Sequence, residues 1–178
     1  MKVFVIDDFK PYIHFLKRNM PHLIKREDVN FYYFYDSIEA LKAIKKEKPS
    51  VIITDMAMPK MDGYAFIENI REVYHPVIVV VSILRNIKNI SVDFKVQKPL
   101  VDLSEFIDTI NQAIELAKEQ MIYETLNDTD CSLENEKFLN SAIYTLTDTI
   151  SKDEKKDRAK VEQKNSKIKN FLFNLFKV

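Results

Sequence analysis

Short apolar runs alternate with amphipathic segments along the first 120 residues of the chain. Val3 to Ile6, Val51 to Thr54 and Val77 to Val81 are continuous runs dominated by β-branched residues, and such runs predict strands that are buried on both faces. Two further strands are predicted from the aromatic run Asn30 to Tyr35 and from the short run Asp93 to Gln97.

Amphipathic helices are predicted between these strands. The first has Pro11 in its opening turn, where proline is tolerated, and we expect it to end before Pro21. The second is predicted to open at Asp36, which forms a capping box with Glu39, and Pro49 closes it. The apolar residues of the first helix recur at helical spacing: Tyr12, Ile13, Leu16 and Met20.

A third helix is predicted around Phe66, Ile67 and Ile70, and a long one starts near Asp102 and runs through at least Lys118. Five strands that alternate with helices predict an α/β fold, in which a doubly wound parallel sheet is covered on both faces. We place this domain at residues 1 to 120.

Residues 121 to 178 are predicted to form a small helical C-terminal region. A helix is expected at about 133 to 150, followed by a charged linker from 151 to 167. The chain then ends in a short amphipathic helix whose apolar stripe must be buried against something. Candidates are the chain itself, a second protomer in a homodimer, a protein partner, and, less favoured, a membrane surface or nucleic acid. The stripe consists of Ile168, Phe171, Leu172, Leu175 and Phe176.

Composition excludes several classes of protein. Of the 178 residues, 46% are hydrophobic and 30% are charged, which is typical of a globular protein and not of a disordered or collagen-like one. The most apolar stretch, Pro76 to Leu84, is far shorter than the roughly 20 residues that a membrane-spanning helix needs. Because no signal-peptide pattern is visible either, we expect a cytoplasmic protein.

The chain has one glycine and one cysteine, which excludes two further kinds of structure. Gly63 cannot by itself form a glycine-rich loop that cradles a nucleotide phosphate, and Cys131 cannot form an internal disulfide. Net charge is zero, yet residues 1 to 150 hold 18 basic and 23 acidic side chains, whereas residues 151 to 178 hold 9 and 4. This asymmetry indicates a basic tail with a role of its own.

Polar residues gather at the carboxyl ends of the predicted strands, where open α/β sheets bind their ligands. These residues are Asp7, Asp8, Asp55, Ser82 and Lys98. Carboxylates at about 4 Å repel each other by roughly 4 kcal/mol per pair at an effective dielectric constant of about 20, so the cluster needs a cation. Oxygen ligands favour Mg²⁺ over zinc. A hydroxyl and an ammonium group beside the carboxylates suit a phosphoryl group.

This arrangement resembles the receiver domain of two-component response regulators, as in the chemotaxis regulators. The resemblance rests on the acidic pair with its preceding Val5-Ile6, on the string from Thr54 to Gly63, on Ser82 and on Lys98-Pro99, all in family order. It covers residues 1 to 120 and implies a five-stranded, flavodoxin-like receiver fold.

The resemblance also implies roles for these residues. Asp55 would be the phospho-acceptor, and Asp7 and Asp8 would bind Mg²⁺ together with Asp55 and the main-chain carbonyl of Ala57. Ser82 and Lys98 would contact the phosphoryl group, and the Lys98-Pro99 peptide bond would be cis.

Three features depart from the family pattern. Ile83 stands where the family carries a small residue and is expected to slow access to Asp55. Only 16 positions separate Ser82 from Lys98, so the fourth helix, at about 84 to 90, is expected to be short or irregular. Lys95, three positions before Lys98, stands where the family commonly carries an aromatic residue that swings inward on activation.

The function that these residues indicate is a phosphorylation-switched signalling protein, not a metabolic enzyme. A sensor histidine kinase would transfer phosphoryl to Asp55 in a phosphorelay, and output would pass to a downstream protein through the receiver face or the C-terminal helices. Two alternatives stay open: a transcriptional regulator that binds DNA, weakened by the lack of a convincing helix-turn-helix, and a phosphorylation-independent scaffold.

Overall fold

The computed structural model describes residues 1–84, 87, 90–98 and 103–128. Backbone contacts divide the chain into two units, Met1–Glu124 and Thr125–Val178, and the sheet lies wholly in the first. In chain order the described elements are β1 (Lys2–Ile6), α1 (Lys10–Leu23), β2 (Asn30–Phe34), α2 (Ser37–Glu47), β3 (Val51–Thr54), α3 (Gly63–Arg71), β4 (Val77–Ser82), β5 (Phe94–Gln97) and α4 (Leu103–Asp128).

The five strands form one sheet in the order β2-β1-β3-β4-β5, and every pairing is parallel. The register aligns Ile6 of β1 with Thr54 of β3, and Thr54 with Val80 of β4. The carboxyl ends of these strands therefore lie side by side. The predicted α/β fold with a doubly wound parallel sheet is confirmed.

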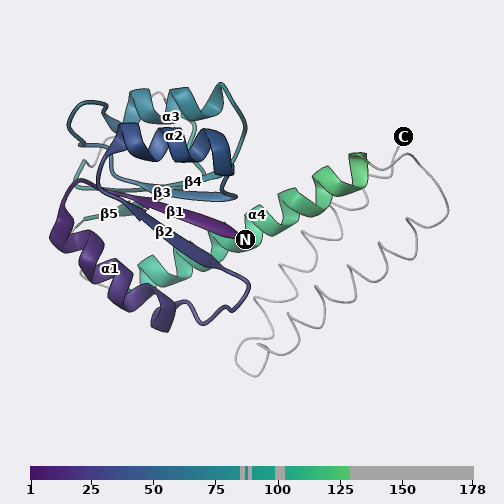
Figure 1. The fold of residues 1–178 in the computed structure, drawn as a ribbon. Coiled ribbons are helices and arrows are strands. Elements are labelled where there is room, and N and C mark those ends of the chain that lie inside the picture. Colours follow the sequence, from purple (N-terminus) through teal and green to yellow (C-terminus); the bar gives the residue numbers. More distant parts are fainter. Residues whose placement is uncertain (85–86, 88–89, 99–102, 129–178) are drawn as a thin grey trace. The chain divides into compact units, whose positions relative to one another are not determined.

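Helices cover both faces of the sheet, α1 and α4 on one and α2 and α3 on the other (Figure 1). Alternation along β1 shows how the sequence supports this: Val3 and Val5 belong to the core cluster that includes residues of α1 and α4, while Phe4 and Ile6 belong to the cluster with residues of α2 and α3. Successive side chains of β1 from Val3 to Ile6 enter the two core clusters alternately, so each of these positions has to be apolar.

The predicted cap of helix α2 at Asp36 is confirmed. The Asp36 carboxylate accepts hydrogen bonds from the main-chain N–H groups of Ile38 (2.9 Å) and Glu39 (3.1 Å), which satisfies two donors of the first turn. The helix ends at Glu47, and Lys48 follows in the left-handed region with φ of 43°. Pro49 therefore lies one residue beyond the turn that terminates the helix.

Helix α1 does not end before Pro21, and that prediction is wrong. The helix continues to Leu23, and the N–H of Ile24 donates to the carbonyl of Met20 at 2.8 Å. Proline lacks the N–H that would bond one turn back, but burial of Met20 and Ile24 in the core outweighs this loss.

The connection between β4 and β5 has irregular backbone at its described positions. Leu84, Ile87 and Ile90 lie outside any helix, although Ile87 and Ile90 pack against a small core cluster. Arg71 of α3 fixes the end of this connection, because its guanidinium donates to the carbonyl of Pro76 (2.8 Å) and pairs with Asp93 (3.2 Å). The short spacing noted in the sequence is thus accommodated without a helix at those positions.

Helix α4 begins with the long amphipathic segment expected after residue 102 and runs on to Asp128. Within the described part of the chain, no helix is both long and apolar enough to cross a membrane. The predicted helix at 133–150, the charged linker and the terminal amphipathic helix lie outside the described residues.

Candidate functional site

Backbone hydrogen bonds extend the sheet one residue past its strand ends and so place the site residues. The N–H of Asp7 donates to Phe34 (3.2 Å), that of Asp55 to Ile6 (3.1 Å), and that of Lys98 to Ser82 (2.9 Å). Because β1, β3, β4 and β5 are successive neighbours, the residues at their carboxyl ends converge on one edge of the sheet.

Three carboxylates meet at this edge. Asp7, Asp8 and Asp55 each offer an oxygen atom, and these atoms all lie within 4.8 Å of one another. Asp7 is 2% exposed and Asp55 is 7% exposed, whereas Asp8 is open to solvent. Two buried negative charges and one exposed one form a cluster that a cation can reach from outside.

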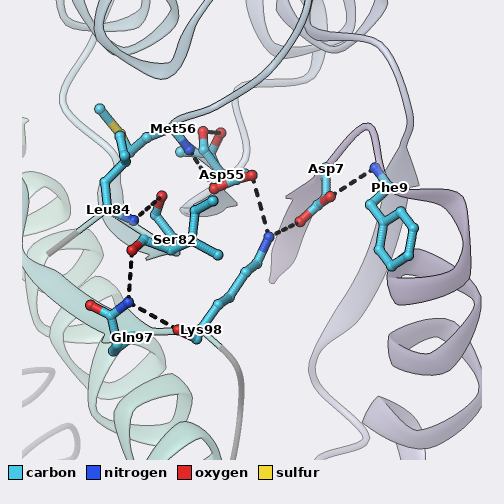
Figure 2. A network of polar contacts seen from close by, with 10 residues as sticks. Asp7, Phe9, Asp55, Met56, Ser82, Leu84, Gln97 and Lys98 are labelled. Carbon is cyan, nitrogen blue, oxygen red and sulfur yellow. Dashed lines mark hydrogen bonds and ion pairs between the residues drawn. The ribbon is translucent and has the colours of Figure 1, made fainter.

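Lys98 supplies the positive charge of the site. Its Nζ lies 2.5 Å from Oδ2 of Asp7 and 3.3 Å from Oδ2 of Asp55, so one ammonium group bridges both buried carboxylates (Figure 2). The lysine side chain is itself largely buried. Its charge offsets part of the cost of burying two carboxylates, which would be large without a partner.

Main-chain donors orient the other oxygen of each buried carboxylate. The N–H of Phe9 donates to Oδ1 of Asp7 at 2.9 Å, and the N–H of Met56 donates to Oδ1 of Asp55 at 2.7 Å (Figure 2). Burial nevertheless raises the pKa of Asp7, although its hydrogen bond and ion pair with Lys98 act in the opposite direction. Keeping the Asp7 carboxylate ionised in this buried position therefore lowers the stability of the fold.

Ser82 is buried at the end of β4, and the neighbouring strand β3 leads directly into Asp55. Its Oγ accepts a hydrogen bond from the N–H of Leu84 at 3.3 Å. The side-chain amide of Gln97 donates to the main-chain carbonyls of Ile83 and Lys98, both at 2.9 Å, and so links the segments that carry Ser82 and Lys98 (Figure 2).

The loop after Asp55 depends on the chain's single glycine. Gly63 donates its N–H to the carbonyl of Met56 at 2.8 Å, and a Cβ at Gly63 would lie only 2.6 Å from Cα of Met56 and 2.7 Å from the carbonyl oxygen of Asp55. Only glycine permits this approach. The first turn of α3 is thereby packed directly against the backbone of Asp55 and Met56.

Two polar residues anchor the rest of this loop. Asp62 caps α3 by accepting from the N–H of Ala65 at 2.9 Å, and Lys60, with φ of 68°, forms an ion pair with Asp36. Ala57 is exposed in the loop two residues after Asp55. Pro99 lies outside the described residues, so the predicted cis peptide bond remains a prediction.

The structure thus brings Asp7, Asp8, Asp55, Ser82 and Lys98 to one edge, as the sequence predicted. Sequence reasoning assigned Tyr12 only to the apolar face of a helix, yet its ring lies 4.6 Å from the Nζ of Lys98. Gln97 was likewise missed as a link between strand ends. The only signal for Tyr12 was its position four residues after Asp8, in the first turn of the helix.

The family model of the response regulator receiver domain matches residues 3–98 of the chain. Among solved structures, a two-component transcriptional regulator AraC from Clostridium phytofermentans is 25% identical, with a TM-score of 0.58, over 69% of this chain and 98% of its own. The Francisella response regulator 1452 receiver domain is also 25% identical, with a TM-score of 0.56, over 67% and 98%. A receiver domain from Clostridium thermocellum is 23% identical, with a TM-score of 0.55, over 67% and 98%.

Proposed function

Because this chain belongs to the response regulator receiver domain family, we propose that it is switched by phosphorylation of Asp55 by a sensor histidine kinase. The observation that carries the proposal is the surroundings of the Asp55 carboxylate. It lies at the carboxyl end of a central strand, with a second buried carboxylate and an exposed one close by and the Lys98 ammonium group 3.3 Å away.

The acidic cluster suits Mg²⁺. Its donors are all oxygen atoms, and one of the three carboxylates faces solvent, so a hydrated cation could bind without an all-protein cage. We propose Asp7, Asp8 and Asp55 as ligands, together with the carbonyl of Ala57. When bound, the ion would neutralise part of the negative charge and bind an oxygen of the incoming phosphoryl group.

The proposed transfer uses the carboxylate of Asp55 as nucleophile. An oxygen of Asp55 attacks the phosphorus of a phosphohistidine; the new O–P bond forms while the N–P bond breaks, and the imidazole nitrogen of the kinase keeps the electron pair. The ammonium group of Lys98 stabilises the charge on the phosphoryl oxygens. The N–H of Met56 keeps the carboxylate of Asp55 oriented.

Ser82 offers a link from the site to its surface. Its hydroxyl accepts from Leu84 in the structure and has a proton to donate to a phosphoryl oxygen. A rotation toward the phosphoryl group would weaken the bond to Leu84, at the start of the β4–β5 connection. Further along this connection, Lys95 donates to the carbonyl of Ile87 at 3.0 Å. We propose that a downstream protein reads this change on the receiver face or through the C-terminal helices.

Titration of Mg²⁺ into the full chain tests the site. Asp8→Ala should weaken binding by at least tenfold, because one of three clustered carboxylates is lost. Glu39→Ala, which removes an exposed acid from α2, should leave the affinity unchanged. Equal binding by wild type and Asp8→Ala would show that the metal site is assigned wrongly.

A DNA-binding output is the second candidate, because one solved structure similar to this chain is that of a two-component transcriptional regulator. Strong, salt-dependent retention of the full chain on DNA would favour it. Normal output from Asp55→Asn would instead favour a scaffold that does not use phosphorylation.

A further inference from the structure

Tyr12 lies in the first turn of α1, directly after the loop that carries Asp7 and Asp8. Its N–H donates to the carbonyl of Phe9 at 2.9 Å, which fixes the start of the helix. The ring is partly buried and packs against the core cluster shared by α1 and α4. The backbone of α1 therefore holds this side chain next to the acidic site.

The ring of Tyr12 is the third group around the ammonium of Lys98. The Nζ lies 4.6 Å from the ring centroid, while it also bridges Asp7 at 2.5 Å and Asp55 at 3.3 Å. An aromatic face attracts a cation within about 6 Å, and the attraction grows as the pair is shielded from water. Lys98 is thus stabilised in its bridging position by two carboxylates and one ring.

The position of Tyr12 is not explained by a hydrogen bond from its hydroxyl group. It is buried and has no hydrogen-bond partner in the part of the chain that the structure describes. The hydroxyl of Tyr74, by contrast, donates to the carbonyl of Pro49 at 3.1 Å. Burial, with the charges of Asp7 and Asp55, raises the pKa of the Tyr12 hydroxyl, so it stays neutral. What Tyr12 offers the site is its ring face.

We infer that Tyr12 is a positioning residue that tunes metal affinity: its ring stabilises Lys98 over Asp7 and Asp55, and so favours the internal cation over the Mg²⁺ that would take its place. This inference rests on the proposed metal site. Both cations need the same carboxylates, so any group that stabilises only the bridging position of Lys98 lowers the affinity for the ion by the same factor.

The effect is measured by titrating MgCl₂ calorimetrically into the full chain and its variants. Tyr12→Phe keeps the ring and should bind Mg²⁺ like wild type. Tyr12→Leu removes the ring and should bind about two- to fivefold more tightly, the factor expected for a partly shielded cation–π contact. If Tyr12→Leu does not fold, Tyr12→Met replaces it, because methionine fills irregular space without offering an aromatic face.

A double-mutant cycle shows whether the effect acts through Lys98. Lys98→Met should itself tighten Mg²⁺ binding, and adding Tyr12→Leu to it should change nothing further. The inference fails if Tyr12→Leu binds like Tyr12→Phe, or if its effect persists without Lys98. Failure of wild type to bind Mg²⁺ at all would instead overturn the proposed function on which the inference rests.

Discussion

The packing of α3 against the backbone of Asp55 and Met56 predicts that Gly63→Ala lowers both the stability of the fold and the rate at which Asp55 is phosphorylated. A Cβ at this position would lie 2.6 Å from Cα of Met56, 2.7 Å from the carbonyl oxygen of Asp55 and 2.7 Å from Sδ of Met56. Two of these three atoms belong to the backbone and cannot rotate away. Ordinary contact begins near 3.4 Å, so the loop or the helix has to move by about 0.8 Å.

The size of the effect follows from two opposing contributions. Overpacking of this kind costs about 1–3 kcal/mol. Replacing glycine by alanine also restricts the unfolded chain, which stabilises the folded state by about 0.4–1 kcal/mol. A net loss of about 1–2 kcal/mol in the free energy of unfolding is expected, which lowers Tm by about 2–8 °C.

Urea unfolding and thermal melts of the full chain measure this loss, with Glu68→Ala on the exposed side of α3 as the matched control. The control should stay within about 0.5 kcal/mol of wild type. Displacement of Met56 would also misalign the N–H that orients Asp55, so labelling of Asp55 should slow at temperatures where Gly63→Ala is folded. A variant as stable as wild type, labelled at the same rate, would refute the packing argument.

Three further changes test other parts of the molecule. Asp7→Asn should raise the free energy of unfolding at neutral pH without metal, because burial raises the pKa of Asp7 and its ionised form therefore opposes folding. For the same reason, the stability of wild type should increase as the pH falls through that raised pKa. Unfolding curves from pH 4 to 8 would contradict this if Asp7→Asn were the less stable protein throughout. Arg71→Met should cost about 1–3 kcal/mol, because it removes the bonds to Pro76 and Asp93, whereas exposed Arg18→Met should cost little by the same urea assay. Ile83→Ala should speed labelling of Asp55 by a small phosphodonor, since the side chain follows Ser82 and is 63% exposed; an unchanged rate would remove the crowding argument.

The strands and the site edge could be predicted because they depend on local patterns. Runs such as Val77 to Val81 are apolar without interruption, and Asp55 and Lys98 follow their strands directly. A parallel sheet brings the carboxyl ends of its strands to one edge, whatever the helices do. This is why residues as far apart in sequence as Asp7 and Lys98 could be expected together.

Other features depend on contacts that no local pattern reveals. The continuation of α1 through Pro21 reflects the burial of Met20 and Ile24, which outweighs the preference of proline for helix ends. The ring of Tyr12 follows the helical spacing of a core residue, and only the packed structure places it beside Lys98. Spacing indicates which face a side chain occupies, but not which group from another element meets it.

The central claim is that Asp55 accepts a phosphoryl group, and site-resolved labelling tests it most directly. The full chain is incubated with acetyl phosphate and Mg²⁺, and intact-mass spectrometry is followed by borohydride trapping and peptide mapping. We predict one added phosphoryl group, located on Asp55, absent from Asp55→Asn and lost when Mg²⁺ is chelated. Equal labelling of Asp55→Asn, or a phosphoryl group mapped to any other residue, would contradict the account.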